Sequence, residues 1–158
     1  MKIEIISYKP QFAKDFYELN IEWLKHFFYV EPYDEDILSQ PEKHIINKGG
    51  HIFFASRNGM NVGTVALMPL NGTPYFELTK MAVSPKFRGL QIGQKLMQHC
   101  IDFALSNNMP KLIIYSNTIL ENAIHIYKKY GFIEIPVEPG VAYERCNIKL
   151  ELNLSSSG

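Results

Sequence analysis

Residues 75–93, YFELTKMAVSPKFRGLQIG, constrain the fold of this chain more than any other stretch. The first part, residues 75–83, is apolar, aromatic and β-branched enough to predict a central strand. Pro85 ends this strand, because proline has no N–H to give to the hydrogen-bond ladder. From Leu90 onward, apolar residues recur at spacings near 3.6, which predicts a helix. The stretch therefore predicts a strand, a tight turn and a helix in immediate succession.

The turn between this strand and this helix has the chemistry of a phosphate-binding loop. Lys86 and Arg88 bring positive charge to it, and Gly89 lets the backbone come close to a ligand. The free N–H groups and the positive dipole end at the start of the following helix favour an anion there.

The segment Arg88-Gly89-Leu90-Gln91-Ile92-Gly93 also resembles a known motif. It is similar to the Q/R-x-x-G-x-G/A loop of the GNAT superfamily of N-acetyltransferases, which holds the pyrophosphate of acetyl-CoA. Arg88 and Gly93 match the first and last motif positions, whereas Gln91 replaces the middle glycine. The strand ELTKMAVSP before the loop and the segment NAIHIYKKYGF after it strengthen the resemblance, which covers residues 77–133 well and the N-terminal third less specifically.

The resemblance implies an α/β fold with three layers, in which helices flank a mixed, mostly antiparallel sheet, as in GNAT acyl-CoA N-acyltransferases. The hydrophobic pattern agrees, because strands and helices alternate along the chain and the Asn58-Gly59 pair predicts a hairpin. In that fold the fourth and fifth strands splay apart, and the pantetheine arm of the cofactor enters the gap. Strands are expected at residues 2–7, 51–57, 61–70, 75–83, 111–115, 132–135 and 143–152. Helices are expected at residues 10–27, 90–107 and from Asn117 or Thr118 to Tyr130, with short helical turns within residues 29–50.

Composition excludes several other classes of protein. The 158 residues favour one domain over residues 1–154, with a disordered tail over residues 155–158. Sixteen basic residues balance sixteen acidic ones, so no basic field indicates a nucleic acid or membrane partner. No apolar run is long enough to span a bilayer and no signal peptide is evident, which predicts a cytoplasmic protein. The five histidines show no ligand spacing, so no metal site is expected.

The resemblance assigns the cofactor to the central strand, the loop and the two helices that follow. Met81 and Val83 would offer main-chain groups to the pantetheine arm, and the Met81 amide would polarise the thioester carbonyl. Many relatives have an asparagine where Leu120 stands, and either Asn117 or Asn122 could substitute for it; a helix cap is the alternative for Asn117. The residues expected at acetyl-CoA are Met81, Ala82, Val83, Arg88, Gly89, Leu90, Gln91, Ile92, Gly93, Gln94, Asn117, Asn122 and Tyr127.

Acetyl transfer to an amine requires a general acid for the departing thiolate. Tyr127 in AIHIYKKYGF stands at the position where GNAT enzymes often carry the tyrosine that donates a proton to this thiolate, so the resemblance implies the same role for Tyr127. The alternative is a tyrosine that merely packs into the core, and Tyr130 competes with Tyr127 for the catalytic role.

Glu77 is the candidate base and also a candidate contact of the acceptor. A carboxylate inside an apolar strand is costly unless it is paired or solvated. Strand alternation puts Glu77 and Lys80 on opposite faces, so the two are not expected to pair. A glutamate at the matching place acts as base in some GNAT enzymes, directly or through water. A salt bridge to a neighbouring strand, or simple solvent exposure, is the alternative.

The acidic, aromatic segment of residues 29–36 lies where GNAT folds shape the acceptor pocket. Glu31 and Tyr33, with Trp23 nearby, would hold a cationic amine by charge and by cation–π attraction. Residues 34–36 are expected only to favour a helix N-terminus through its dipole.

Two functions therefore remain open from the sequence. The first is an N-acetyltransferase that moves an acetyl group from acetyl-CoA to a small-molecule amine or a peptide. The second is a non-catalytic acyl-CoA-binding sensor or interaction module, which the replacement of a motif glycine by Gln91 would favour. Exposed strands near the C-terminus could support a homodimer.

Overall fold

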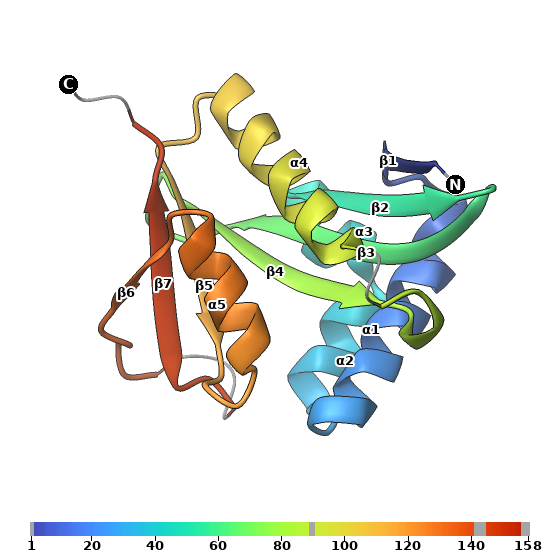
Figure 1. Ribbon diagram of the computed structural model, residues 1–158, viewed down its shortest axis with the longest axis horizontal. Helices are drawn as coiled ribbons and strands as arrows, with labels where there is room; N and C mark the ends of the chain where they lie inside the picture. Colours follow the sequence, from blue (N-terminus) through green and yellow to red (C-terminus); the bar gives the residue numbers. More distant parts are fainter. Residues whose placement is uncertain (1, 89–90, 141–144, 156–158) are drawn as a thin grey trace.

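The computed structural model describes residues 2–88, 91–140 and 145–155. Within them, seven strands form one sheet in the order β1-β2-β3-β4-β5-β7-β6 (Figure 1). Only β4 and β5 pair in parallel, so the mixed and mostly antiparallel sheet predicted from the sequence is confirmed. The strands are β1 (Ile3–Ser7), β2 (His51–Arg57), β3 (Met60–Pro69), β4 (Phe76–Val83), β5 (Lys111–Ser116), β6 (Ile133–Ile135) and β7 (Ile148–Asn153).

Helices cover both faces of this sheet and complete the three layers (Figure 1). They are α1 (Ala13–Phe27), α2 (Pro32–Ser39), α3 (Pro41–His44), α4 (Ile92–Ser106) and α5 (Glu121–Lys129), with 3-10 turns at Pro10–Phe12, Ile46–Lys48 and Pro85–Phe87. One apolar cluster joins α4 and α5 to the sheet, through residues such as Leu96 and Ile124. A second cluster joins α1 and α2 to the opposite face, through Phe16 and Leu38. The strands β2 and β3 are therefore buried on both sides.

The pairing of β4 with β5 is short. It comprises Phe76 opposite Leu112 and Glu77 opposite Ile113. Beyond these pairs the two strands diverge (Figure 1), as the GNAT resemblance predicted. The main-chain groups of β4 after Glu77 are consequently available on this side for another hydrogen-bonding partner.

A β-bulge in β4 reverses the alternation of its side chains. Ala66 of β3 lies opposite Thr79 and Thr64 lies opposite Ala82, so β4 has one extra residue there, and Lys80 has a φ of 57°. After the bulge, Met81 faces α4, because a Cβ added at Gly93 would lie 3.6 Å from its sulfur. The predicted uninterrupted alternation of β4 is therefore wrong.

Two further boundaries differ from the prediction. Helix α5 begins at Glu121 with Leu120 as its N-cap, and neither Asn117 nor Thr118 caps it. Asn117 instead accepts a hydrogen bond from the Ile119 N–H at 2.9 Å and donates one to the Arg145 carbonyl at 2.6 Å. Strand β7 begins five residues later than expected, at Ile148. Of the predicted tail, only Ser155 lies within the described residues.

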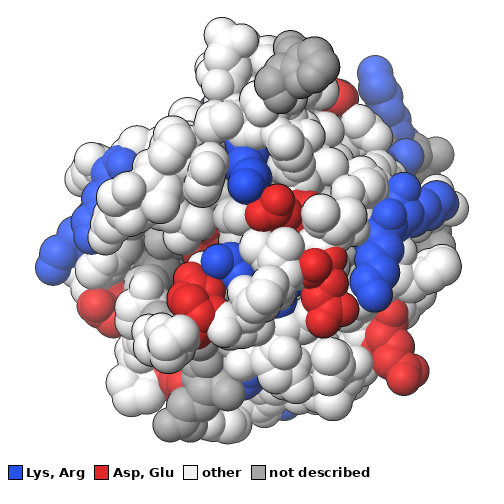
Figure 2. Space-filling view, turned by 90° about the vertical axis from the view of Figure 1, so that its left-hand side faces the viewer, with Lys and Arg blue, Asp and Glu red and all other residues white. Residues whose placement is uncertain are grey.

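Charges of both signs are interspersed on the face that Figure 2 shows. No helix among the described residues has the length and apolar character that a membrane span requires.

Candidate functional site

Two cavities meet between the splayed strands. We call the cavity of about 340 Å³ beside the start of α4 the loop cavity, and the cavity of about 280 Å³ beside α1 the aromatic cavity. Both are lined by Met81, Val83, Arg88, Ala123 and Tyr127. Because they share this wall, the two cavities form one continuous site with β4 along it.

The loop cavity is built around the N-terminus of α4. Phe87, Arg88 and the first turn of α4 line one side of it, and Asn122 and Ile126 of α5 line the other. Gln91, the N-cap of α4, has the left-handed backbone angles φ 58° and ψ 26°. A glycine adopts this conformation without steric cost, which explains physically why the family motif has glycine at this place. Gln91 adopts the same left-handed backbone conformation, and its Cβ makes that conformation strained.

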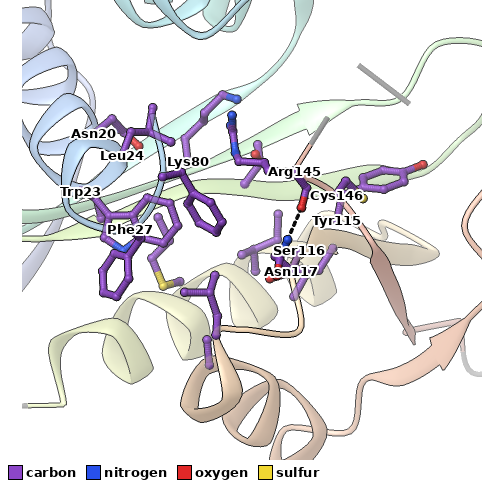
Figure 3. Close-up of a pocket in the computed structure, with 18 of the residues that line it drawn as sticks. Asn20, Trp23, Leu24, Phe27, Lys80, Tyr115, Ser116, Asn117, Arg145 and Cys146 are labelled. Atoms are coloured by element: carbon purple, nitrogen blue, oxygen red, sulfur yellow. Dashed lines mark hydrogen bonds between the residues drawn. The ribbon is translucent and has the colours of Figure 1, made fainter. Parts of the chain in front are cut away.

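The aromatic cavity takes its name from α1, which supplies Trp23, Leu24 and Phe27 to its wall, with Phe28 directly after the helix (Figure 3). The Trp23 ring lies 5.1 Å from that of Phe27 and 5.8 Å from that of Phe28, measured between centroids. Residues of β4, β5 and the segment at Arg145 form the rest of the wall. The cavity thus combines an apolar side with a charged side.

Tyr127 lies where the two cavities meet. Its ring is half-buried, 6.3 Å from the Phe132 ring. Burial raises the pKa of Tyr127 to about 12, and a hydrogen bond with Ser116 acts in the opposite direction. The hydroxyl therefore keeps its proton through neutral pH and is able to donate it. Tyr130, the competing candidate, packs against the core and lines neither cavity.

Glu77 and Lys80 lie together in the aromatic cavity. Burial raises the pKa of Glu77, whereas the Lys80 charge and a hydrogen bond with Thr79 lower it. Burial also lowers the pKa of Lys80 to about 8, against the attraction of Glu77. Strand alternation predicted that Glu77 and Lys80 do not pair. Their charges nevertheless act on each other, because the bulge at Lys80 interrupts the alternation on which that prediction rested.

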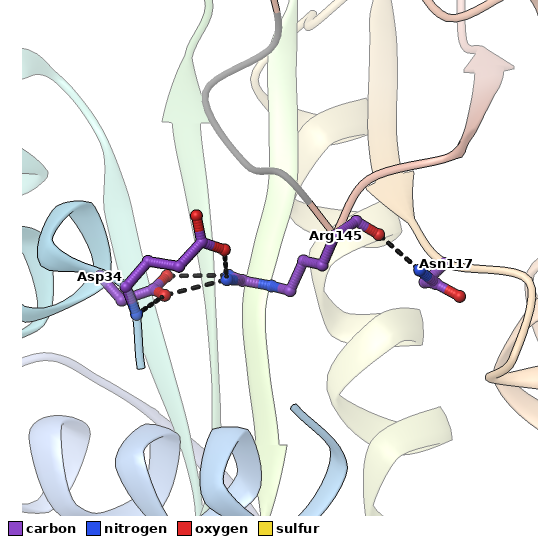
Figure 4. Close-up of polar contacts among 4 residues, drawn as sticks. Asp34, Asn117 and Arg145 are labelled. Atoms are coloured by element: carbon purple, nitrogen blue, oxygen red, sulfur yellow. Dashed lines mark hydrogen bonds and ion pairs between the residues drawn. The ribbon is translucent and has the colours of Figure 1, made fainter. Parts of the chain in front are cut away.

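Arg145 binds two buried carboxylates at the edge of this cavity (Figure 4). Its Nη1 donates to Glu31 Oε2 at 2.6 Å and to Asp34 Oδ2 at 2.9 Å, and its Nη2 donates to Asp34 Oδ1 at 2.8 Å. Asp34 also accepts a hydrogen bond from the Glu31 N–H at 3.0 Å, within the capping box of α2. Only 1% of the Asp34 side chain is exposed. From the sequence, only a helix-dipole effect is predicted for Asp34 and no role is predicted for Arg145, because the two residues lie 111 positions apart.

The sequence matches the acetyltransferase (GNAT) family over residues 13–132. The chain belongs to this family. The resemblance predicted from the loop motif is therefore confirmed, and with it the class of enzyme, an acetyltransferase.

Relatives of known sequence or structure agree with this membership. An uncharacterized N-acetyltransferase of Schizosaccharomyces pombe is 25% identical over 126 residues, which are 78% of this chain and 77% of that protein. The spermidine N(1)-acetyltransferase of Escherichia coli K12 is 26% identical over 109 residues, 67% of this chain and 59% of that enzyme. This chain thus spans less than two thirds of the latter. The crystal structure of a GNAT acetyltransferase from Staphylococcus aureus Mu50 superposes with a TM-score of 0.86 at 25% identity, covering 98% of this chain and 100% of the other.

The structure of this GNAT chain brings most of the predicted site residues together. Nine of the expected cofactor residues line the loop cavity, and Ala82 and Asn117 line the aromatic cavity with Glu77 and Trp23. Gly89 and Leu90 lie outside the described residues. Glu31 and Tyr33 line neither cavity. The nine are Met81, Val83, Arg88, Gln91, Ile92, Gly93, Gln94, Asn122 and Tyr127.

Proposed function

We propose that this protein transfers an acetyl group from acetyl-CoA to a primary amine of a small molecule or peptide, by direct attack in a ternary complex. The observation that carries the proposal is that Tyr127 lines both the loop cavity, which is suited to the cofactor, and the aromatic cavity, which is suited to the acceptor. GNAT enzymes use acyl-CoA, and acetyl is the acyl group that we propose here.

The cofactor would lie along the loop cavity. Its pyrophosphate would accept hydrogen bonds from the free N–H groups at the start of α4, where Arg88 adds positive charge. Its pantetheine arm would pair with the main chain of β4 at Met81 and Val83, in the place that a neighbouring strand would take. The thioester would then lie next to Tyr127.

The chain has a group for each proton and charge that the reaction moves. Glu77, directly or through a water molecule, would accept the proton of the ammonium, and the free amine would attack the thioester carbon. The Met81 amide would stabilise the negative oxygen of the tetrahedral intermediate. When that intermediate collapses, the C–S bond breaks and Tyr127 donates its proton to the thiolate. The nitrogen gives up its second proton, through a water molecule, to the Tyr127 oxygen, which restores the hydroxyl. The products are the acetylated amine and CoA.

Thermal unfolding with ligands tests the cofactor part of this proposal. At a hundredfold excess over Kd, acetyl-CoA should stabilise the protein by about 2.7 kcal/mol, which raises Tm by roughly 5–10 °C for a chain of this size. An adenine nucleotide without the pantetheine arm should give a much smaller shift. No shift with acetyl-CoA would overturn the proposal.

Gln91 favours a second candidate, a non-catalytic acyl-CoA-binding sensor or interaction module with the same fold. Its side chain stands in the loop where the family motif has glycine. Turnover distinguishes the two functions. A protein that binds acetyl-CoA but releases no CoA with any primary amine, at a rate above that of spontaneous hydrolysis, would support the sensor.

We also propose that residues 1–154 act as one domain in the cytoplasm. A homodimer could form through β6, an edge strand of the sheet whose Ile133 side chain is 60% exposed. Sedimentation of the wild type beside Ile133→Lys tests this assembly, since a dimer through β6 should dissociate in the variant.

A further inference from the structure

The aromatic cavity has a composition that discriminates between classes of amine. Its α1 side consists of Asn20, Trp23, Leu24 and Phe27, with Phe28 directly after the helix. Phe27 remains 37% exposed, and the Arg88 guanidinium lies 5.5 Å from its ring centroid. An exposed apolar wall inside a cavity costs free energy in water, and this cost is relieved when an apolar ligand covers the wall. The wall is continuous with the cavity that holds Tyr127, so a ligand bound against it would lie beside the reacting atoms.

The charges in the same cavity disfavour polyamines. Among the described residues that line it, Glu77 is the one acidic side chain, and Lys80, Arg88 and Arg145 are all basic. The neighbouring carboxylates of Glu31 and Asp34 line neither cavity, and both accept hydrogen bonds from Arg145. A polyamine carries further ammonium groups beside the reacting one, and each would need a carboxylate of its own.

The size of the cavity points in the same direction. About 280 Å³ lies at the small end of ligand pockets, which usually measure about 300–1,000 Å³. One ring with a short amine-bearing chain fits this space.

We propose that the acceptor is a monoamine carried on an aromatic or branched apolar group, which packs against Trp23, Phe27 and Phe28, and that it is not a polyamine. This inference rests on the proposed acetyl transfer. It differs from the acceptor site expected from the sequence, because Glu31 binds Arg145 and the wall of the cavity is formed by Trp23 together with Phe27 and Phe28.

Trp23 is the only tryptophan in the chain, so its fluorescence reports directly on this wall. Protein saturated with CoA would be titrated with 2-phenylethylamine, with propylamine as the matched monoamine without a ring, and with spermidine. We expect a saturable change in emission with 2-phenylethylamine, at a concentration at least tenfold lower than with either of the others. Equal or tighter binding of spermidine, or no saturable change with 2-phenylethylamine, would overturn the inference.

A kinetic arm uses acetyl-CoA and measures the release of the CoA thiol. Phe27→Ala should lower kcat/KM for 2-phenylethylamine about tenfold and change that for propylamine less than twofold. Tyr29→Ala is the matched control, because Tyr29 is an exposed aromatic residue two positions along that lines neither cavity. Spermidine turned over faster than 2-phenylethylamine would overturn the inference and leave the proposed function standing. Failure of acetyl-CoA to raise Tm would instead reject the proposed function.

Discussion

The loop cavity and the aromatic cavity meet at Tyr127 but are assembled in opposite ways. The loop cavity comes mainly from one short stretch, which runs from β4 through the turn into α4, with α5 opposite. The aromatic cavity combines α1, β4, β5 and Arg145, and Arg145 binds a carboxylate 114 residues away in the sequence. The first cavity contains the N-terminus of a helix, where backbone N–H groups are available to a ligand, and the second is lined by side chains from several separate segments.

This difference indicates which of the two cavities tolerates changes in its side chains. Helix N-terminal amides and strand edges bind phosphate and amide groups whatever the neighbouring side chains are, as Gln91 illustrates by keeping the backbone shape of a glycine. The aromatic cavity depends on the identity of its side chains, so its specificity can change with few substitutions. Variants of the two halves should therefore separate cofactor binding from acceptor use.

The largest effect on stability is expected for a substitution of Arg145, which should alter the aromatic cavity and leave the loop cavity unchanged. Arg145→Met leaves the buried Asp34 carboxylate without its cation and should lower the free energy of unfolding by about 3–5 kcal/mol. Under conditions where the variant is folded, its Kd for acetyl-CoA should change less than twofold. Urea unfolding and calorimetric titration measure the two quantities.

Lys128→Met is the control for Arg145→Met. It breaks an exposed ion pair with Glu134 at 3.9 Å and should cost less than about 1 kcal/mol. Similar losses in the two variants would contradict the buried network, and a large loss of cofactor affinity in Arg145→Met would contradict the separation of the two halves.

Tyr127→Phe should have the next largest effect, on the rate of turnover, because Tyr127 lines both cavities. We expect kcat to fall by roughly 10²-fold with little change in the Kd for acetyl-CoA, since the ring remains and only the proton donor is lost. Steady-state kinetics with 2-phenylethylamine, beside a binding titration, would check this. Tyr130→Phe in the same helix is the control, and unchanged turnover in Tyr127→Phe would remove the tyrosine from the mechanism.

Glu77→Gln tests the base in the acceptor half through the pH dependence of the rate. A base works when ionised, so kcat/KM should rise as the pH passes upward through the pKa of Glu77. Because burial raises that pKa, this rise should lie above pH 4.3, about where an ordinary glutamate titrates. In Glu77→Gln the rise should disappear and the plateau should fall about tenfold. A pH profile that Glu77→Gln leaves unchanged would show that Glu77 only binds or packs.

Gln91→Gly should have the smallest effect, on stability and on acetyl-CoA binding, and this effect should be confined to the loop cavity. Glycine relieves the left-handed strain at this position but loses more conformational entropy, so the net gain in stability should be at most about 1 kcal/mol. Acetyl-CoA should bind slightly tighter, while kcat/KM ratios between amines stay constant. Thermal unfolding with and without acetyl-CoA measures both.

Gly93→Ala is the control within the same loop. A Cβ at Gly93 would lie 3.6 Å from the Met81 sulfur, an ordinary van der Waals contact, so the stability should barely change. Weaker acetyl-CoA binding in Gln91→Gly than in wild type would show that the glutamine side chain itself contributes to the cradle.

The amino-acid sequence alone determined the family, the sheet and most of the residues that line the loop cavity, because these depend on local signals. Hydrophobic periodicity, Pro85 and the Arg88 to Gly93 motif each act within a few residues, and the structure places nine of the predicted residues at the loop cavity. The tertiary structure alone decided the charged side of the aromatic cavity. A single extra residue at Lys80 reversed the alternation of β4 and brought Lys80 beside Glu77. Pairing between Arg145 and two distant carboxylates has no local pattern, because buried charges find partners through space and not along the chain.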